Sequence, residues 1–406
     1  MQELESWRAG GSLPAMVLRI SVISIGIMLW HGCSQPVRDS PIPAVNVRIP
    51  SPPVPMHGSD RQTHLVYELF LENTGKDELK LNRLEVFPTD GATPLATYVD
   101  NALSEILFHG SPLEDPETQR VLKSHETIGA YLWLTFRSGE SLPRSLRHTF
   151  VFQSNGNDLV LSDSPASAVK VSADEPIVLG PPLRGGPWVA GHGPANNSKH
   201  RRSPVFYMDR LTFSQRFAFD FVLINKAGRG FTGSVSRNEN WAGYGAEVLA
   251  VADGIVAATA DGVPENTPLD NPFDKGMPTT DPKAQPGNFV SLDIGRNAFA
   301  LYAHLQPGSI RVKTGARVRR GQVIGLVGNN GNSGAPHLHF QVSDGPFLHD
   351  SNGLPFVFDS FEILGSTTMG WTVGLEPKGS APPDFDSMPI RQQSTMPLSN
   401  SVIQFR

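Results

Sequence analysis

Histidines and one aspartate provide the residue types and spacings that could do chemistry in this chain. His337 and His339 stand two positions apart in the segment GAPHLHFQV. Residues two apart in a strand share one face, so one imidazole could bind a metal while the other contacts the water on that metal. A half-buried polar strand face is the alternative interpretation, and the pair alone does not decide between them.

Two other segments place polar groups where a site would need them. Tyr302 and His304 share one face of the segment ALYAHL, upstream of the histidine pair. Asp220 lies between phenylalanines in the segment RFAFDF. Burial of an unpaired carboxylate costs free energy, so we expect Asp220 to be exposed, paired or bound to a metal. Each of these residues alone also fits an ordinary local hydrogen bond.

Short runs that alternate apolar and polar residues predict strands in both halves of the chain. Between residues 61 and 180 they read HLVYELFLEN, ELKLNRLEVF, TIGAYLWLTF and RHTFVFQS, and turn-rich segments separate them. Such spacing is typical of a small β-sandwich of immunoglobulin-like kind. Between the second and third runs we expect a short helix or loop. From residue 181 the predicted strands are RFAFDFVLI, AEVLAVADGIVAAT, NFVSLDI, FALYAHL, GQVIGLVG and HLHFQV. The insertion at 261–287 is expected to form a surface loop beside the site.

The composition excludes several classes of protein. The 406 residues carry a net charge of −5 and no long basic run, so we expect no nucleic-acid partner. The 39 glycines and 35 prolines argue against a helical bundle. A single cysteine excludes internal disulfides and a cysteine-rich metal site. The sequence holds neither an HExxH string nor a GxSxG elbow, so it predicts neither a helix-borne glutamate base nor a serine nucleophile.

The N-terminal segment predicts export. Residues 20–30, ISVISIGIMLW, fit the apolar region of a signal peptide, and a start at Met16 gives it a short basic beginning. Cys33 follows this run in a segment that resembles a bacterial lipoprotein box, and a chance free thiol is the alternative. Residues 34–60 contain seven prolines and predict a stiff tether. We therefore expect an exported protein of the cell envelope, anchored to the membrane through a lipid on Cys33 or through the N-terminal segment itself.

Three segments in the second half, in this order, resemble the lysostaphin-like zinc metallo-endopeptidases, which cut peptidoglycan. They are AEVLAVADGIV, LYAHL and GARVRRGQVIGLVGNNGNSGAPHLHF. The resemblance covers residues 185–365 and implies a mostly antiparallel β-fold, a site in a groove between loops, the cofactor Zn²⁺ and a peptidoglycan peptide as substrate. We therefore expect a mainly β chain in which an immunoglobulin-like sandwich precedes a lysostaphin-type peptidase domain. The expected divisions are a signal peptide at 1–33, a tether at 34–60, the sandwich at 61–180, the peptidase at 181–365 and a C-terminal extension at 366–406.

The resemblance also implies a role for each candidate residue. His339, the second histidine of the pair, matches a zinc ligand, and Asp220 matches the carboxylate ligand of the family. His337 matches a catalytic residue beside the zinc. His304, in the LYAHL segment, matches its catalytic partner.

The third zinc ligand departs from the family pattern. The family places a histidine four residues before the aspartate, but here Arg216 stands there, and its guanidinium stays protonated and cannot bind zinc. The upstream candidates are His200 in SKHRR and His192 in GHG. The chain is similar to a branch of the family with a displaced His-Arg pair and a following QRxAxD string. We therefore expect His200 to be the ligand, with His192 and the loss of the zinc site as alternatives.

This ligand set implies a catalytic metal site. Two histidines and one aspartate leave a position for water, whose pKa zinc lowers from about 15.7 towards about 7. His304 and His337 are then expected to orient or deprotonate this water and to hydrogen-bond the oxyanion. We expect a zinc-dependent endopeptidase that hydrolyses peptide bonds of peptidoglycan. The alternatives are a zinc-free lysostaphin-like module that binds cell wall or activates another hydrolase, and a zinc protease that acts on a protein.

Overall fold

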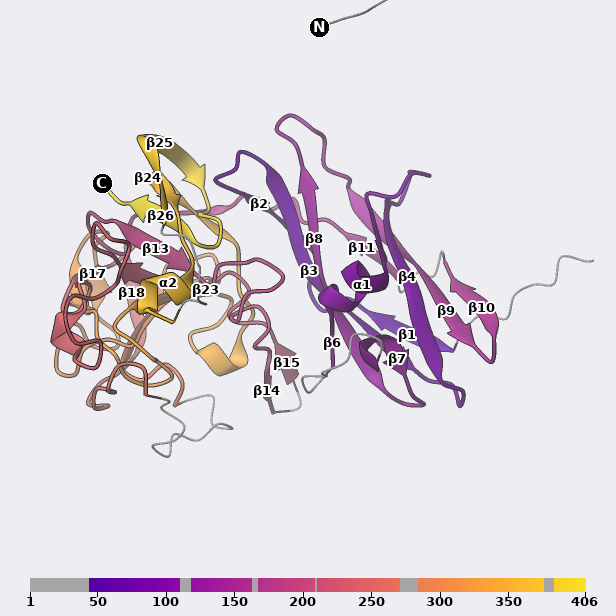
Figure 1. Ribbon diagram of the computed structural model, residues 1–406, viewed down its shortest axis with the longest axis horizontal. Coiled ribbons are helices and arrows are strands. Elements are labelled where there is room, and N and C mark those ends of the chain that lie inside the picture. The colour runs from indigo at the N-terminus through magenta and orange to yellow at the C-terminus, as the bar shows by residue number, and fades with distance from the viewer. Residues whose placement is uncertain (1–43, 110–117, 163–166, 209, 271–283, 376–382) are drawn as a thin grey trace, which may run out of the picture. The chain divides into compact units, whose positions relative to one another are not determined.

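The computed structural model describes residues 44–109, 118–162, 167–208, 210–270, 284–375 and 383–406. Within these ranges the chain is mainly β, which confirms the expected fold class (Figure 1). No helix in the described ranges is long and apolar enough to cross a membrane. The predicted signal peptide, the start at Met16 and the lipid anchor at Cys33 lie outside the described residues.

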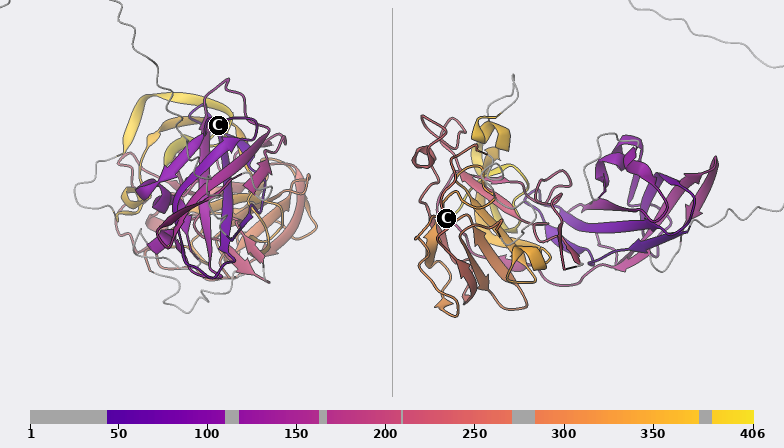
Figure 2. Two further views of the ribbon diagram at one scale, coloured as in Figure 1. Left: turned by 90° about the vertical axis from the view of Figure 1, so that its right-hand side faces the viewer. Right: turned by 90° about the horizontal axis from the view of Figure 1, so that it is seen from below.

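Two antiparallel sheets form the N-terminal domain (Figures 1 and 2). The first sheet consists of β1 (Val45–Arg48), β3 (Thr63–Asn73), β8 (Thr127–Phe136) and β6 (Leu107–Phe108), with β2 (Val54–His57) paired to β3. The second sheet consists of β10 (Asn157–Leu161), β9 (Ser145–Ser154), β4 (Leu79–Pro88) and β5 (Ala96–Val99), with β7 (Val121–Leu122) and β11 (Ala168–Lys170) beside them. The segment between β5 and β8 holds α1 (Asp100–Ile106) and a 3₁₀ turn (Thr118–Arg120), where we expected a short helix or loop.

Alternation along the strands explains why these two sheets pack as a sandwich. Leu65, Tyr67 and Leu69 of β3 point to one face and are fully buried. They share a core with Leu84 of β4 and Phe150 of β9 from the other sheet. Side chains two apart in a strand share a face, so this pattern buries one whole face of β3 between the sheets. The immunoglobulin-like kind of sandwich stays a prediction.

The sandwich begins earlier than the sequence analysis placed it. The expected tether at 34–60 contains β1 and β2, which both pair with β3. Proline lacks a backbone N–H and is found in strands mainly at edges or between them. Pro55 lies in β2, at the side of β3, and the other described prolines of this segment all fall between β1 and β2. The proline content therefore marks edge strands here, and the sheet extends into the predicted tether.

One large sheet forms the C-terminal domain. Its order is β12 (Ile177–Leu179), β24 (Phe356–Ser366), β26 (Ser401–Gln404), β13 (Trp188–Gly191), β16 (Phe219–Leu223), β23 (Leu338–Ser343), β20 (Phe299–Ala303), β19 (Phe289–Asp293), β18 (Gly254–Ala260) and β21 (Arg317–Val318). Neighbouring strands are antiparallel, except that β12 runs parallel to β24. Smaller elements are the pairs β14 (Val205–Tyr207) with β15 (Arg210–Thr212) and β17 (Glu247–Leu249) with β22 (Val323–Leu326), and the helix α2 (Met369–Val373).

Both ends of this sheet differ from the expected divisions. β12 lies inside the range expected for the sandwich but pairs with β24 of the large sheet. In the expected C-terminal extension, β25 (Asp384–Thr395) pairs with β24, and β26 pairs with β24 and β13. The extension is therefore part of the sheet that carries the candidate site.

Aromatic residues at alternate positions build the core beneath the site. Phe219 and Phe221 of β16 flank Asp220, and Leu338 and Phe340 of β23 flank His339. All four flanking side chains are fully buried in the largest core cluster. Because period-two alternation sends their neighbours to the opposite face, the core fixes the direction of the candidate ligands.

Candidate metal centre and active site

Sheet register brings Asp220 and His339 together. The two residues lie directly opposite each other in the antiparallel strands β16 and β23. Nδ1 of His339 lies 3.1 Å from Oδ1 of Asp220, and Nε2 of His339 lies 3.0 Å from Oε1 of Gln341. Residues 119 positions apart in sequence thus meet through strand pairing alone.

His200 approaches the same carboxylate from a loop. It belongs to the segment between β13 and β14, and its Nε2 lies 3.3 Å from Oδ2 of Asp220. Its ring meets that of His339 edge to face at 4.7 Å. The potential ligand atoms of His200, Asp220 and His339 all lie within 4.8 Å of one another. The structure therefore brings together the three residues that we expected to bind zinc.

His192, the alternative ligand, lies next to this group. Its ring centroid is 5.4 Å from that of His200. Burial lowers the pKa of His192 to about 4, although the charge of Asp220 opposes this shift. His192 is not a member of the three-residue group that the described residues form.

His304 and His337 lie beside the group, with their rings 4.8 Å apart. His304 follows β20, and its Nδ1 donates a hydrogen bond of 2.7 Å to the carbonyl of Asn330. Nδ1 of His337 donates a hydrogen bond of 2.7 Å to the carbonyl of Ala335. Nε2 of His337 lies 3.1 Å from Oδ1 of Asp220. Both rings therefore have a fixed orientation: Nε2 of His337 is paired with Asp220, and Nε2 of His304 is left for chemistry.

The electrostatic surroundings give these two histidines opposite tendencies. Burial, together with His337 and His339, holds the pKa of His304 well below its usual value. Burial also opposes the charged form of His337, but the carboxylate of Asp220 outweighs it and raises the pKa. His304 is thus a neutral imidazole near pH 7, whereas His337 more readily carries a proton.

Burial raises the pKa of Asp220, but His200 and His337 outweigh burial and hold this pKa well below its usual range. Asp220 is therefore ionised. Burial lowers the pKa of His339, so this ring is neutral, as a metal ligand must be.

The donor set fits zinc. With Nε2–H of His339 donating to Gln341, its Nδ1 bears a lone pair that faces the ionised Asp220. Nδ1 of His339 and Oδ1 of Asp220 are both electron-rich and repel each other unless a cation binds to both. Nδ1 of His200 is buried and has no hydrogen-bond partner among the described residues. Two histidines and one carboxylate with space for a further ligand are the donors of catalytic zinc sites.

A cleft of about 970 Å³ surrounds these groups. Its volume lies at the upper end of the range for binding sites of small ligands. Polar side chains that line it include Lys199, Ser203, Gln215, Gln285 and Asn332, and apolar ones include Val222, Met369, Val373 and Leu375. Loops and α2 contribute most of these walls, in agreement with the groove that the resemblance implied.

Arg216, at the position where the family has a ligand, is buried and serves another contact. Its Nε donates a hydrogen bond of 2.8 Å to Oε2 of Glu68 in β3. The next strand, β16, carries Asp220 to the site. Arg216 therefore connects the N-terminal domain to the segment that enters the ligand strand.

Three residues that support the candidate site were not predicted from the sequence. Asn330 lies in the segment GNNGNSG, which is rich in turn residues and gives no sign that its carbonyl orients His304. Gln341 shares the strand face of His339, so the spacing HxHxQ could have suggested its contact. Glu68 lies in a predicted strand, and its charge alone does not indicate which residues it pairs with.

Comparisons with known proteins identify relatives of this chain. Residues 240–347 match Peptidase family M23. Peptidoglycan DD-endopeptidase ShyA of Vibrio cholerae serotype O1 is 38% identical over 80 residues, which are 20% of this chain and 18% of that protein. Glycyl-glycine endopeptidase ALE-1 of Staphylococcus capitis is 44% identical over 67 residues, 16% of this chain and 18% of that protein. A solved structure, titled as a putative peptidase M23 from Pseudomonas aeruginosa, is 14% identical and aligns with 77% of this chain and 93% of its own, with a TM-score of 0.26.

Residues 240–347 of the C-terminal domain thus match the M23 family, which confirms the resemblance to lysostaphin-like peptidases seen in the sequence. Zinc is the cofactor of this family, as expected. The alignments span less than a fifth of the length of the two curated relatives. The family match includes His304, His337 and His339, whereas His200 and Asp220 precede it.

Proposed function

We propose that this chain is a zinc-dependent endopeptidase that hydrolyses peptide bonds of peptidoglycan in the bacterial cell envelope. The observation that carries the proposal is the convergence of His200, Asp220 and His339 within 4.8 Å. His304 and His337 line the same cleft. Only a catalytic centre needs a metal-binding group and two further histidines in one cleft, since a structural zinc site uses protein ligands at every position.

His200, Asp220 and His339 would hold the zinc. When bound, this ion polarises the scissile carbonyl and lowers the pKa of a coordinated water. The residues themselves are prepared for that role by second contacts: Gln341 fixes the ring of His339, and Asp220 stays ionised in its buried position.

His304 serves as the proton acceptor in this proposal. Its Nδ1–H is committed to the carbonyl of Asn330, so the lone pair is on Nε2. The lowered pKa keeps that lone pair free near pH 7. A neutral imidazole with a fixed tautomer can accept a proton from the attacking water and pass it to the leaving amine.

His337 serves as the hydrogen-bond donor. Its pKa is raised and its Nδ1–H is bound by the carbonyl of Ala335, so Nε2–H, which faces Oδ1 of Asp220 at 3.1 Å, is the donor at the site. A charged donor beside the reaction centre stabilises the negative charge that develops on the carbonyl oxygen. The two neighbouring rings thereby divide the work of accepting and donating.

The names of the relatives support peptidoglycan as the substrate, since one of them is called a peptidoglycan endopeptidase. Action in the envelope agrees with the export signal that the sequence predicts at residues 1–33, and the lipid anchor at Cys33 forms part of the proposal. The zinc-free alternative drew its support from Arg216. His200 beside Asp220 weakens that support, because it supplies the ligand that Arg216 cannot.

Digestion of purified sacculi tests the proposal. Wild-type protein with added zinc should release soluble fragments with new amino and carboxyl termini from one type of peptide bond, detected by mass spectrometry. Asp220→Asn should release none, and His125→Asn, which changes an exposed histidine outside the cleft, should act like wild type. Intact sacculi with zinc-loaded wild type would contradict the proposal. Cleavage of a glycine-rich protein alone would favour a protease with a protein substrate.

A further inference from the structure

The three candidate ligands differ in what holds them in place. Asp220 and His339 are fixed by the pairing of β16 with β23 over a phenylalanine-rich core. His200 belongs to a turn within the long connection between β13 and β14. A loop residue reaches the precision of a metal ligand only when neighbouring contacts restrain it. The restraint on His200 therefore decides whether the site is formed before the metal binds.

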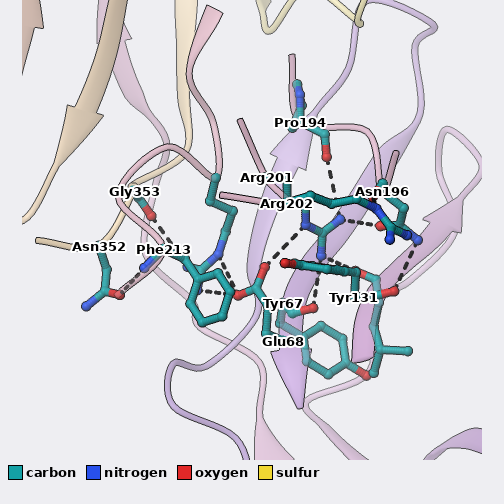
Figure 3. A network of polar contacts seen from close by, with 12 residues as sticks. Tyr67, Glu68, Tyr131, Pro194, Asn196, Arg201, Arg202, Phe213, Asn352 and Gly353 are labelled. Atoms are coloured by element: carbon teal, nitrogen blue, oxygen red, sulfur yellow. Dashed lines mark hydrogen bonds and ion pairs between the residues drawn. The ribbon is translucent and has the colours of Figure 1, made fainter. Parts of the chain in front are cut away.

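Arg201, the next residue, provides this restraint by inserting into the N-terminal domain (Figure 3). Its side chain is completely buried and donates to the carbonyls of Tyr67 and Leu132 at 3.0 and 2.9 Å. Its Nε donates to Oε1 of Glu68 at 3.2 Å. These partners lie on β3 and β8, so the guanidinium joins the His200 turn to two strands of the sandwich.

Glu68 also accepts a hydrogen bond from a second arginine, Arg216. Oε2 of Glu68 accepts from Nε of Arg216, four residues before Asp220. One carboxylate of the N-terminal domain thus binds the segment that carries His200 and the segment that leads to Asp220. Arg201 and Arg216 occupy its two oxygens separately.

Water is excluded from this carboxylate. Glu68 has a side-chain exposure of 0%, as does Arg201, and Arg216 has 6%. On the same face of β3, Val66 packs into the core of the C-terminal domain and Phe70 packs against Phe213. Losing one partner of a buried ion pair leaves an uncompensated charge, so the geometry of such a pair is strongly held.

We propose that Glu68 is a positioning residue of the zinc site, which acts from the N-terminal domain through Arg201 on His200 and through Arg216 on the approach to Asp220. This inference rests on the proposed zinc ligands. It assigns a function to the sandwich: the domain completes the metal site of the peptidase by holding the one ligand that no strand holds. Residues that orient metal ligands typically contribute a factor of about 10–100 to metal affinity or activity.

Zinc affinity of full-length variants tests this role. We would measure the zinc Kd by competition with a chromophoric chelator, together with the melting temperature, for Glu68→Gln and Arg201→Lys. Both variants should bind zinc about 10–100 times more weakly than wild type. Arg201→Lys keeps a positive charge beside Glu68 but loses the fork that reaches the carbonyls, so it decides the question if Glu68→Gln fails to fold.

Two reference variants separate positioning from stability and from the proposed function. Val86→Ala removes buried volume from the sandwich core away from Glu68, so it should lower the melting temperature and leave the zinc Kd unchanged. His200→Ala should lose tight zinc binding. Wild-type affinity in both Glu68→Gln and Arg201→Lys, or an equal loss in Val86→Ala, would overturn the positioning role while the proposed function stands. Wild-type affinity in His200→Ala would instead overturn the zinc ligand set itself.

Discussion

Replacement of His304 by asparagine isolates the proton acceptor from the metal site. His304 has a positive φ of 64°, a backbone conformation that asparagine tolerates far better than alanine. The substitution removes Nε2, and the asparagine amide can still donate to the carbonyl of Asn330 in place of Nδ1. Because His304 is not one of the three ligands, zinc should stay bound. The variant therefore changes the chemistry and leaves most of the site in place.

The expected magnitudes differ sharply between activity and stability. Even complete loss of the hydrogen bond to Asn330 should lower the free energy of unfolding by only about 1 kcal/mol. Loss of a general base should lower kcat by about 10²–10⁴-fold, equivalent to about 2.7–5.5 kcal/mol in the activation free energy. The zinc content should remain at the wild-type ratio.

The assay combines three measurements on the same preparations. Zinc content is measured by atomic emission, stability by urea unfolding, and kcat by the release of fragments from sacculi. His125→Asn is the matched control, because His125 also has a positive φ, of 61°, and is exposed outside the cleft. If His304→Asn retained more than about a tenth of the wild-type kcat with zinc bound, the assignment of His304 as general base would be refuted.

Three further outcomes follow from the same structure. Dialysis against a chelator should abolish hydrolysis of sacculi and lower the melting temperature, and added zinc should restore both; activity that persists without metal would contradict the account. Phe221→Ala should lower the free energy of unfolding by about 3–5 kcal/mol in urea titrations, because this fully buried ring packs on Phe219 and Phe405. A decrease of less than about 1 kcal/mol would show that the core does not support β16 as described. Burial raises the pKa of Glu265 from 4.5 to about 7, so the folded state binds its proton more tightly than the unfolded state and wild type loses stability as the pH rises between these values. Glu265→Gln has no carboxyl group at this position, so between pH 5 and pH 8 its urea midpoint should rise relative to that of wild type. If the urea midpoints of the two proteins changed with pH in the same way, the raised pKa would be refuted.

Period-two alternation made the strands predictable from sequence. The expected segments around Asp220 and His339 became β16 and β23 because phenylalanine and leucine at alternate positions bury one face. The resemblance to one family then named both residues as ligands. Their direct opposition required the strand register, which no local pattern encodes.

Other features depend on contacts between distant segments, and the sequence alone could not supply them. The choice of His200 over His192 rested on a resemblance, and the structure adds the short distance from His200 to Asp220. The proline-rich segment contained β1 and β2 because pairing with β3 outweighs its low intrinsic preference for strands. Glu68 is a charged residue inside a predicted strand, and its partners, Arg201 and Arg216, come from the other domain.

Zinc stoichiometry of the purified chain tests the central claim most directly. Atomic emission should find one zinc per wild-type chain, and His200→Ala should lose this zinc after dialysis against a weak chelator that wild type withstands. Such a result would establish His200 with Asp220 and His339 as the ligand set. A wild-type chain that binds no zinc after reconstitution would contradict the enzyme proposal, and a variant that keeps its zinc would contradict the role of His200.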